Sequence, residues 1–264
     1  MIRVTVWGEY VQESGELREE FLPPGGIPQE RKAEFQHFVE ETAKKIKEVY
    51  PLGITGTIAA YLEKCGDMEI THVNMYMPEY GLPDEVLEHT DVLIWWAHIA
   101  HEAVPDALVA KIKNRILRGM GFLALHSAHP CKVMQELLGT SGSLRWREGD
   151  KARVWNICPT HPIAQGIPEY FELEPEEMYG ERFDIPAPDE LIFISWYKGG
   201  EVFRSGCTWN RGYGKIFYFQ PGHETNPSYH NPHVMRVIEN AVRWAAPVMW
   251  RENLDCPNTE PVEK

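Results

Sequence analysis

The sequence lacks the features that mark several familiar classes of protein. It has no run of about eighteen consecutive apolar residues, and it opens on a strand-like segment, residues 2–6, without a charged leader and cleavage site. Its five cysteines are odd in number and show no CxxC spacing, which argues against a disulfide framework and against a thiolate zinc site. We therefore expect a cytoplasmic protein with reduced thiols and no membrane partner.

Positive charge is also scarce. The chain carries 26 Lys and Arg against 39 Asp and Glu, a formal net charge of −13, so most of its surface would repel a phosphate backbone. We expect no nucleic-acid partner and no nucleotide cofactor, and we find no internal repeat or low-complexity tract. Exposed aromatic residues favour a homo-oligomer.

The first half of the chain alternates strand-like and helix-like segments. A loop at Pro23–Gly26 should be exposed and flexible. A parallel neighbour can be reached only through a crossover, so the alternation predicts an α/β fold with a doubly wound, mostly parallel sheet. The expected strands are 2–6, 68–73, 91–96 and 121–125, and the expected helices are 29–50, 55–64 and 105–118.

Beyond Gly139 the pattern changes to short strand candidates between turns rich in proline and glycine. These should extend the sheet with antiparallel pieces before a final helix at 232–245. We expect one domain over 1–247 and a loosely packed tail over 248–264. The strand candidates are 152–157, 191–195, 202–208 and 215–219.

Histidines follow several of the expected strands. Ligands of open parallel sheets bind at the carboxyl ends of the strands, so His98, His126 and His223 should face one crevice there. Three imidazoles from separate strands would suit a zinc ion and leave a fourth position for water or substrate. Alternative ligands are Glu9, His101, His129 and Glu224.

Without a metal, the same residues would act as acid and base. His126, His223 and Glu224 are then the catalytic candidates, with Glu9, Glu181 or Glu224 orienting the imidazoles. His126 stands at a position typical of a strand-to-helix elbow. A serine nucleophile is disfavoured, because the lipase-type glycines that would flank Ser127 are missing, and this hydroxyl better suits a helix cap or an anion.

Aromatic side chains near these strand ends could supply flat faces for sugar rings while acids bind the hydroxyls. The alternative for each ring is packing in the core, which is favoured for Trp95 and Trp196 because they lie inside apolar runs. The expected substrate-binding residues are Trp7, Glu9, Trp96, Ser127, Tyr179 and Glu181.

Four blocks of sequence resemble the trehalose-utilisation, or ThuA-like, proteins, in that family's order and over nearly the whole chain. The resemblance implies a flavodoxin-like fold of the class I glutamine amidotransferase kind. The blocks are Trp95-Trp96-Ala97-His98, Gly121 to Ala128, Glu177-Met178-Tyr179-Gly180-Glu181, and Gly214 to Glu224.

Amidotransferases of that fold carry a cysteine at the elbow, whereas this position holds His126, and Cys131 lies too far along to replace it. His223-Glu224 is similar to the histidine and acid of the amidotransferase triad but lacks the one-residue gap between them. Glutamine amidotransferase activity is therefore not expected.

The resemblance implies a role in the use of trehalose or related disaccharides. Combined with the histidines, it suggests that a carbohydrate or keto-sugar is hydrolysed or isomerised through His126 and His223, with zinc as the candidate cofactor. Two alternatives stay open. One is a non-catalytic sugar-binding or regulatory protein on this scaffold, and the other is a remnant glutaminase that uses another nucleophile.

Overall fold

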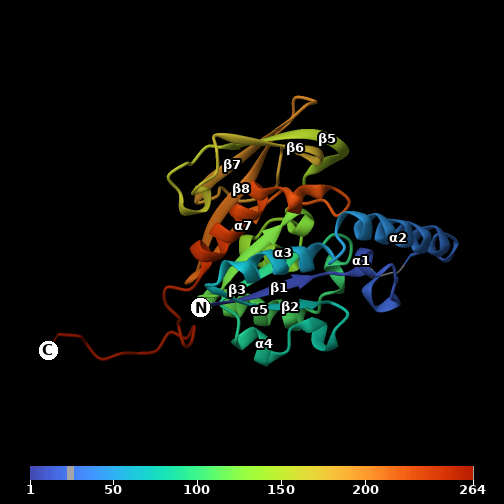
Figure 1. Cartoon of the computed structure of the whole chain (residues 1–264). Coiled ribbons are helices and arrows are strands. Elements are labelled where there is room, and N and C mark those ends of the chain that lie inside the picture. Colours follow the sequence, from blue (N-terminus) through green and yellow to red (C-terminus); the bar gives the residue numbers. More distant parts are fainter. Residues whose placement is uncertain (23–26, 264) are drawn as a thin grey trace.

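A computed structural model describes residues 1–22 and 27–263, so the loop predicted at Pro23–Gly26 lies outside the described residues. The strands of this part of the chain form one mixed sheet of nine strands, in the order β2-β1-β3-β4-β9-β8-β7-β5-β6 (Figure 1). The parallel part comprises β1 (Ile2–Gly8), β2 (Met68–Asn74), β3 (Val92–Trp96), β4 (Gly121–Leu125) and β9 (Gly214–Phe219). The antiparallel part comprises β5 (Arg145–Asn156), β6 (Tyr170–Gly180), β7 (Glu190–Tyr197) and β8 (Val202–Arg211).

Helices cover the parallel strands. In Figure 1, α3 and α7 lie above these strands, and α4 and α5 lie below them. Short 3₁₀ turns complete several connections, including η5 (His126–Ala128) directly after β4. The α-helices are α1 (Val11–Ser14), α2 (Gln29–Val49), α3 (Ile54–Leu62), α4 (Asp84–Glu88), α5 (Asp106–Arg118), α6 (Lys132–Leu138) and α7 (Pro232–Ala245). The other 3₁₀ turns are η1 (Glu19–Phe21), η2 (Glu63–Cys65), η3 (Pro78–Gly81), η4 (His101–Ala103), η6 (Pro162–Ala164) and η7 (Pro227–His230).

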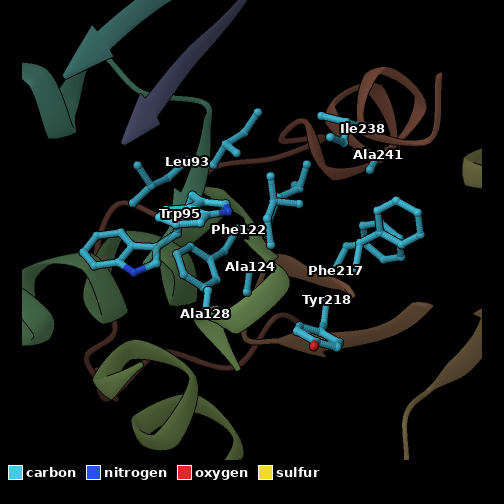
Figure 2. Packing of buried hydrophobic residues seen from close by; sticks show 14 of the residues in the cluster. Leu93, Trp95, Phe122, Ala124, Ala128, Phe217, Tyr218, Ile238 and Ala241 are labelled. Atoms are coloured by element: carbon cyan, nitrogen blue, oxygen red, sulfur yellow. The ribbon is translucent and has the colours of Figure 1, made fainter. Parts of the chain in front are cut away.

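The central strands are apolar because both of their faces are covered. Every residue of β3 and of β4 is buried, as the continuous apolar runs in the sequence predict. Figure 2 shows side chains of β3, β4 and β9 packed together, with Ile238 and Ala241 of α7 beside them. Full burial of each large apolar side chain contributes about 1.5–3 kcal/mol, so this core fixes the strand ends that carry the histidines.

The antiparallel part departs from the sequence prediction. β5 begins at Arg145, seven residues before the predicted start, and β6 was not predicted at all. β6 contains Pro175 and four glutamates, which are unfavourable in a central strand. It is stable here because it is the last strand in the order, where one backbone edge needs no partner.

The chain after α7 is held at one point and then leaves the body. The Arg115 guanidinium lies 4.3 Å from the centre of the Trp250 ring, and the backbone N–H of Arg251 donates to the Arg118 carbonyl. Residues 251–263 are exposed and have no regular structure. Figure 1 shows this segment extending away from the sheet.

Among the described segments, no helix combines the length and the apolarity that a bilayer crossing requires.

Candidate functional site

The carboxyl ends of three neighbouring parallel strands bring His98, His126 and His223 together. These residues follow β3, β4 and β9, which lie side by side in the sheet. The ring centroids are 6.1 Å apart for His98 and His126, 5.9 Å for His98 and His223, and 5.6 Å for His126 and His223. The register of the parallel sheet therefore assembles a cluster from residues that lie far apart in the sequence, between positions 98 and 223.

The cluster is more enclosed than the sequence analysis predicts. His126 is fully buried and His223 is 4% exposed, so they do not line an open crevice. The side chain of His98 is 24% exposed and that of Glu148 is 67% exposed. The cluster therefore meets solvent at these two residues.

His126 occupies a sharp turn between β4 and η5, with a positive φ of 51° that non-glycine residues seldom adopt. Three hydrogen bonds hold the turn. The His126 Nδ1–H donates to the Gln220 carbonyl at 2.9 Å, the Tyr218 hydroxyl donates to the His126 carbonyl at 3.0 Å, and the Ser127 hydroxyl donates to the Ala97 carbonyl at 2.8 Å. The elbow thus directs the imidazole toward the cluster, while the Ser127 hydroxyl is used in a hydrogen bond to the backbone.

Two of the imidazoles face buried carboxylates. His98 Nδ1 lies 3.0 Å from Glu224 Oε2, and His126 Nε2 lies 3.0 Å from Glu177 Oε2. Gln12 donates to the other oxygen of Glu224 at 2.8 Å. The site therefore consists of two pairs of imidazole and carboxylate, with His223 next to both.

Opposite charges shift the proton affinities of these pairs. Burial disfavours the charged imidazole of His98, but the Glu224 carboxylate outweighs it and raises the pKa of His98 to about 9. Burial would raise the pKa of Glu224, yet His98 and the other imidazoles lower it to about 2. In the second pair, burial again disfavours both charged forms. The attraction between the partners outweighs burial, so the pKa of His126 is raised and that of Glu177 is lowered.

Glu9 has a different role from the predicted ones of binding sugar or orienting an imidazole. Its buried carboxylate accepts hydrogen bonds from the backbone N–H groups of His98, Ile99 and Ala100 at 2.8–3.0 Å. Burial raises its pKa, and these three donors lower it in part. Glu9 therefore fixes the loop that presents His98.

The aromatic residues that were predicted to bind sugar rings largely belong to the core. Trp7 is buried and stacks on Trp95 with ring centroids 3.6 Å apart, so no sugar can reach its face. Trp96 is also buried, donates to the Gly222 carbonyl at 3.2 Å, and places its ring edge-on to His98. The Tyr179 ring stacks on that of His126 at 5.2 Å and is 2% exposed.

Glu181 lies outside the cluster's contacts. Its carboxylate accepts two hydrogen bonds from the Arg204 guanidinium, at 2.9 and 3.0 Å, and one from the backbone N–H of Phe183. Neither Glu9 nor Glu181 contacts an imidazole of the cluster, and of the three predicted orienting acids only Glu224 does so.

The sequence analysis missed Glu177 and Glu148. Glu177 belongs to β6, the unpredicted strand, and Glu148 belongs to the early part of β5, which precedes the predicted strand at 152–157. Glu177 opens the block Glu177–Glu181 that carries the family resemblance, and this was the available signal. Nothing in the sequence around Glu148 marks it.

The two other predicted ligand histidines are held neutral. Burial, with a smaller contribution from neighbouring imidazoles, lowers the pKa of His101 to about 3 and that of His129 to about 4. His129 Nδ1–H donates to the Gly142 carbonyl at 2.6 Å. These two rings add no positive charge to the site at neutral pH.

Metal-ligating atoms meet in a set that the sequence did not predict. Across residues 1–22 and 27–263, the group whose ligand atoms all lie within 4.8 Å of one another is Glu148, Glu177 and His223. The predicted set of His98, His126 and His223 is not such a group, because His98 and His126 direct their nitrogens at separate carboxylates.

Cys131 is unsuited to replace the missing elbow cysteine. It is 2% exposed, and burial raises the pKa of its thiol to about 12. A thiolate, which is the nucleophilic form, is therefore strongly disfavoured there.

Comparison with known proteins places this chain in a family. The family model ThuA, described as trehalose utilisation, matches residues 29–245. The chain belongs to the ThuA family. No curated protein sequence matches it.

Solved structures of ThuA-like proteins have a similar fold. A ThuA-like protein from Parabacteroides merdae superposes with a TM-score of 0.57 at 12% identity, covering 96% of this chain and 92% of that one. A ThuA-like protein from Bacteroides uniformis gives a TM-score of 0.52 at 15% identity, covering 92% and 90%. A cytoplasmic protein from Salmonella typhimurium gives 0.54 at 14% identity, covering 74% and 88%. At these identities the likeness concerns the fold.

Proposed function

We propose that this ThuA-family protein hydrolyses or isomerises a carbohydrate, trehalose or a related disaccharide or keto-sugar, at the histidine–carboxylate cluster. Family membership supports a role in trehalose utilisation. The observation that carries the proposal is the meeting of three imidazoles, with ring centroids 5.6–6.1 Å apart, against the buried carboxylates of Glu177 and Glu224.

Both candidate reactions need an acid and a base close together. Hydrolysis of a glycosidic bond needs one group to protonate the leaving oxygen and another to activate water. Isomerisation of a keto-sugar needs a base that removes the proton beside the carbonyl and an acid that protonates its oxygen. Imidazoles paired with carboxylates supply protonated and unprotonated groups at adjacent positions.

We assign the proton transfers to His126 and His223. The Gln220 carbonyl fixes His126 with its proton on Nδ1, so Nε2 is the atom that exchanges a proton with substrate or with Glu177. Glu224 contacts both His98 and His223, at 3.0 and 3.6 Å, and keeps positive charge in the site. Sugar hydroxyls would bind at the exposed side, next to His98.

The scaffold supports the resemblance to class I glutamine amidotransferases. The parallel strands run in the order β2-β1-β3-β4-β9, which corresponds to the flavodoxin-like order, and the site lies at the carboxyl ends where such sheets bind ligands. We extend the description of the Salmonella neighbour, a cytoplasmic protein, to this chain as part of the proposal. A homo-oligomer remains our expectation.

The test is turnover of trehalose and of trehalose oxidised to a ketone on one ring, followed by product analysis. His223→Gln and His126→Gln should each lower kcat at least 100-fold, because each removes a proton-transfer group. His37→Gln, on the exposed face of α2, is the matched control and should leave kcat unchanged. Thermal melting of each variant separates loss of chemistry from loss of fold, and full activity of both cluster variants would refute the assignment.

The burial of His126 favours a second candidate, a sugar-binding or regulatory protein without turnover. Calorimetry with trehalose and with the keto-sugar distinguishes the two. Binding that His98→Gln weakens, with no product under any metal condition, would support the second candidate.

A further inference from the structure

We infer that His223, Glu177 and Glu148 bind one divalent metal ion, zinc or manganese, and that a β-bulge in β5 supplies the third ligand. The inference deepens the proposed carbohydrate function, because the ion would lie in the same cluster. It replaces the predicted set of three histidines with one histidine and two carboxylates.

The distances suit a metal without large movement. His223 Nε2 lies 3.7 Å from Glu148 Oε1, and all three ligand atoms lie within 4.8 Å of one another. Two ligands bound about 2.1 Å from the same ion are separated by about 3.4 Å in a tetrahedron and about 4.2 Å when opposite each other. Side-chain adjustments of less than about 1 Å would therefore complete the site.

An unpartnered buried oxygen points to a missing ligand. Glu177 Oε2 is buried and has no hydrogen-bond partner among the described residues, although His126 Nε2 is only 3.0 Å away. His126 Nδ1–H donates to the Gln220 carbonyl, so the other ring nitrogen, Nε2, is the atom that faces this oxygen. A buried carboxylate oxygen without a hydrogen-bond partner needs a cation beside it, and a metal ion held with His223 and Glu148 would supply one.

The charge of the cluster leads to the same requirement. Within the part of the chain that the structure describes, Glu148, Glu177 and Glu224 have histidines as their only ion-pair partners. Glu9 and Glu176 add two further buried carboxyl groups. Buried carboxylates need cationic partners, and a metal ion beside His223 would add one to the imidazoles that face Glu177 and Glu224.

The backbone delivers Glu148 to this position. In the pairing of β5 with β6, Arg147 stands opposite Met178 and Asp150 stands opposite Glu176, so Glu148 and Gly149 face the single residue Glu177. Such a bulge redirects a side chain, and Gly149 adopts the positive φ, 70°, that the turn of the backbone needs.

Ion pairs on both sides hold the bulge closed. The Arg147 guanidinium binds Asp150 at 2.5 Å and Glu201 at 2.8 Å. Glu148 has no lysine or arginine partner among the described residues, and its carboxylate lies 3.7 Å from His223 Nε2.

The environment of His223 also suits a ligand. Metal-bound imidazoles usually donate their second N–H to an oxygen, which fixes the ring. His223 Nδ1 lies 3.0 Å from the Thr225 hydroxyl, which can accept that proton once Nε2 is bound to an ion. In the structure the backbone N–H of Thr225 donates to Nδ1 at 3.2 Å, so binding of an ion at Nε2 requires the ring to take the other tautomer, with its proton on Nδ1.

The experiment measures metal affinity directly and needs no sugar. Full-length protein is stripped with a chelator, and Zn²⁺ and Mn²⁺ are titrated in competition with a chromophoric chelator. Co²⁺ absorption in the visible region gives a second readout. All proteins carry Cys256→Ser, because this exposed thiol could bind zinc on its own.

We expect one equivalent of ion in the parent protein, a Kd raised at least 10-fold in Glu148→Gln, and loss of the stoichiometric site in His223→Gln. Glu174→Gln, an exposed glutamate on the same strand as Glu177, should bind like the parent. Glu148 is mostly exposed, so its replacement leaves the fold intact. Absence of stoichiometric binding, or an unchanged Kd in Glu148→Gln, would overturn the inference, whereas metal binding without sugar turnover would overturn only the proposed reaction.

Discussion

Replacing Glu13 by Gln should stabilise the protein at alkaline pH and change its stability much less at acid pH. Glu13 is 5% exposed, and one of its oxygens accepts the backbone N–H of Ile54 at the start of α3. The other oxygen, Oε2, is buried without a hydrogen-bond partner among the described residues. Gln keeps the acceptor for Ile54 and removes the charge.

The magnitude follows from the proton affinity of this carboxyl group. Burial raises the pKa of Glu13 from 4.5 to about 7. The folded protein therefore binds the proton more tightly than the unfolded chain, and its stability falls as pH rises from 4.5 through about 7. At about 1.4 kcal/mol per pH unit, the loss between pH 5 and pH 8.5 is about 2–3 kcal/mol.

Urea unfolding of both proteins at pH 5 and pH 8.5 measures this difference. Relative to the parent, the free energy of unfolding of Glu13→Gln should be larger by about 2–3 kcal/mol at pH 8.5 than at pH 5, which corresponds to a Tm higher by roughly 5 °C. Glu34→Gln, on the exposed face of α2, should follow the parent at both values. If Glu13→Gln and the parent lose stability in parallel, the burial argument is wrong.

Three further predictions test the assignment of structural roles. Glu181→Gln should cost about 1 kcal/mol of stability through its weakened pairing with arginine, and should leave sugar binding unchanged in calorimetry. Gly142→Ala should lower the free energy of unfolding by about 2 kcal/mol more than Gly139→Ala does. Both glycines have a positive φ, but only at Gly142 would a Cβ meet a backbone carbonyl, so equal losses would contradict this reasoning. Trp7→Phe should reduce the Tm through loss of ring stacking, and a reduced sugar affinity with an unchanged Tm would instead show that the ring is part of the binding site.

The parallel part of the fold was predictable because its residues obey simple rules. Runs such as 92–96 and 121–125 are apolar throughout, and a strand covered on both faces requires that composition. Helices α2 and α5 follow their apolar periodicity and end at the residues that stop them, at Pro51 and Gly119.

The rest depended on partners far away in the chain. β6 is stable only as an edge strand against β5, so its acids and Pro175 gave no strand signal. Trp7 looked like a binding residue because it precedes Gly8 and Glu9, but the parallel register places it directly beside Trp95. No local pattern contains that register.

The site, too, has residues that the sequence predicts and residues that it does not. The positions of His98, His126 and His223 follow from the rule that ligands gather at the carboxyl ends of parallel strands. Their partners Glu177 and Glu148 come from the antiparallel strands, and a bulge of one residue decides which way Glu148 points. A shift of register by one residue would remove this ligand, and composition carries no information about it.

The order of the strands has a consequence for how the protein is made. β9 lies between β4 and β8, in the middle of the sheet, although it is the last of these nine strands to be synthesised. Until residues 214–219 are synthesised, the two halves of the sheet have no common neighbour, and their open edges are exposed to chaperones and to other nascent chains. Because His223 follows β9, insertion of this one segment joins the two halves and completes the cluster in the same event.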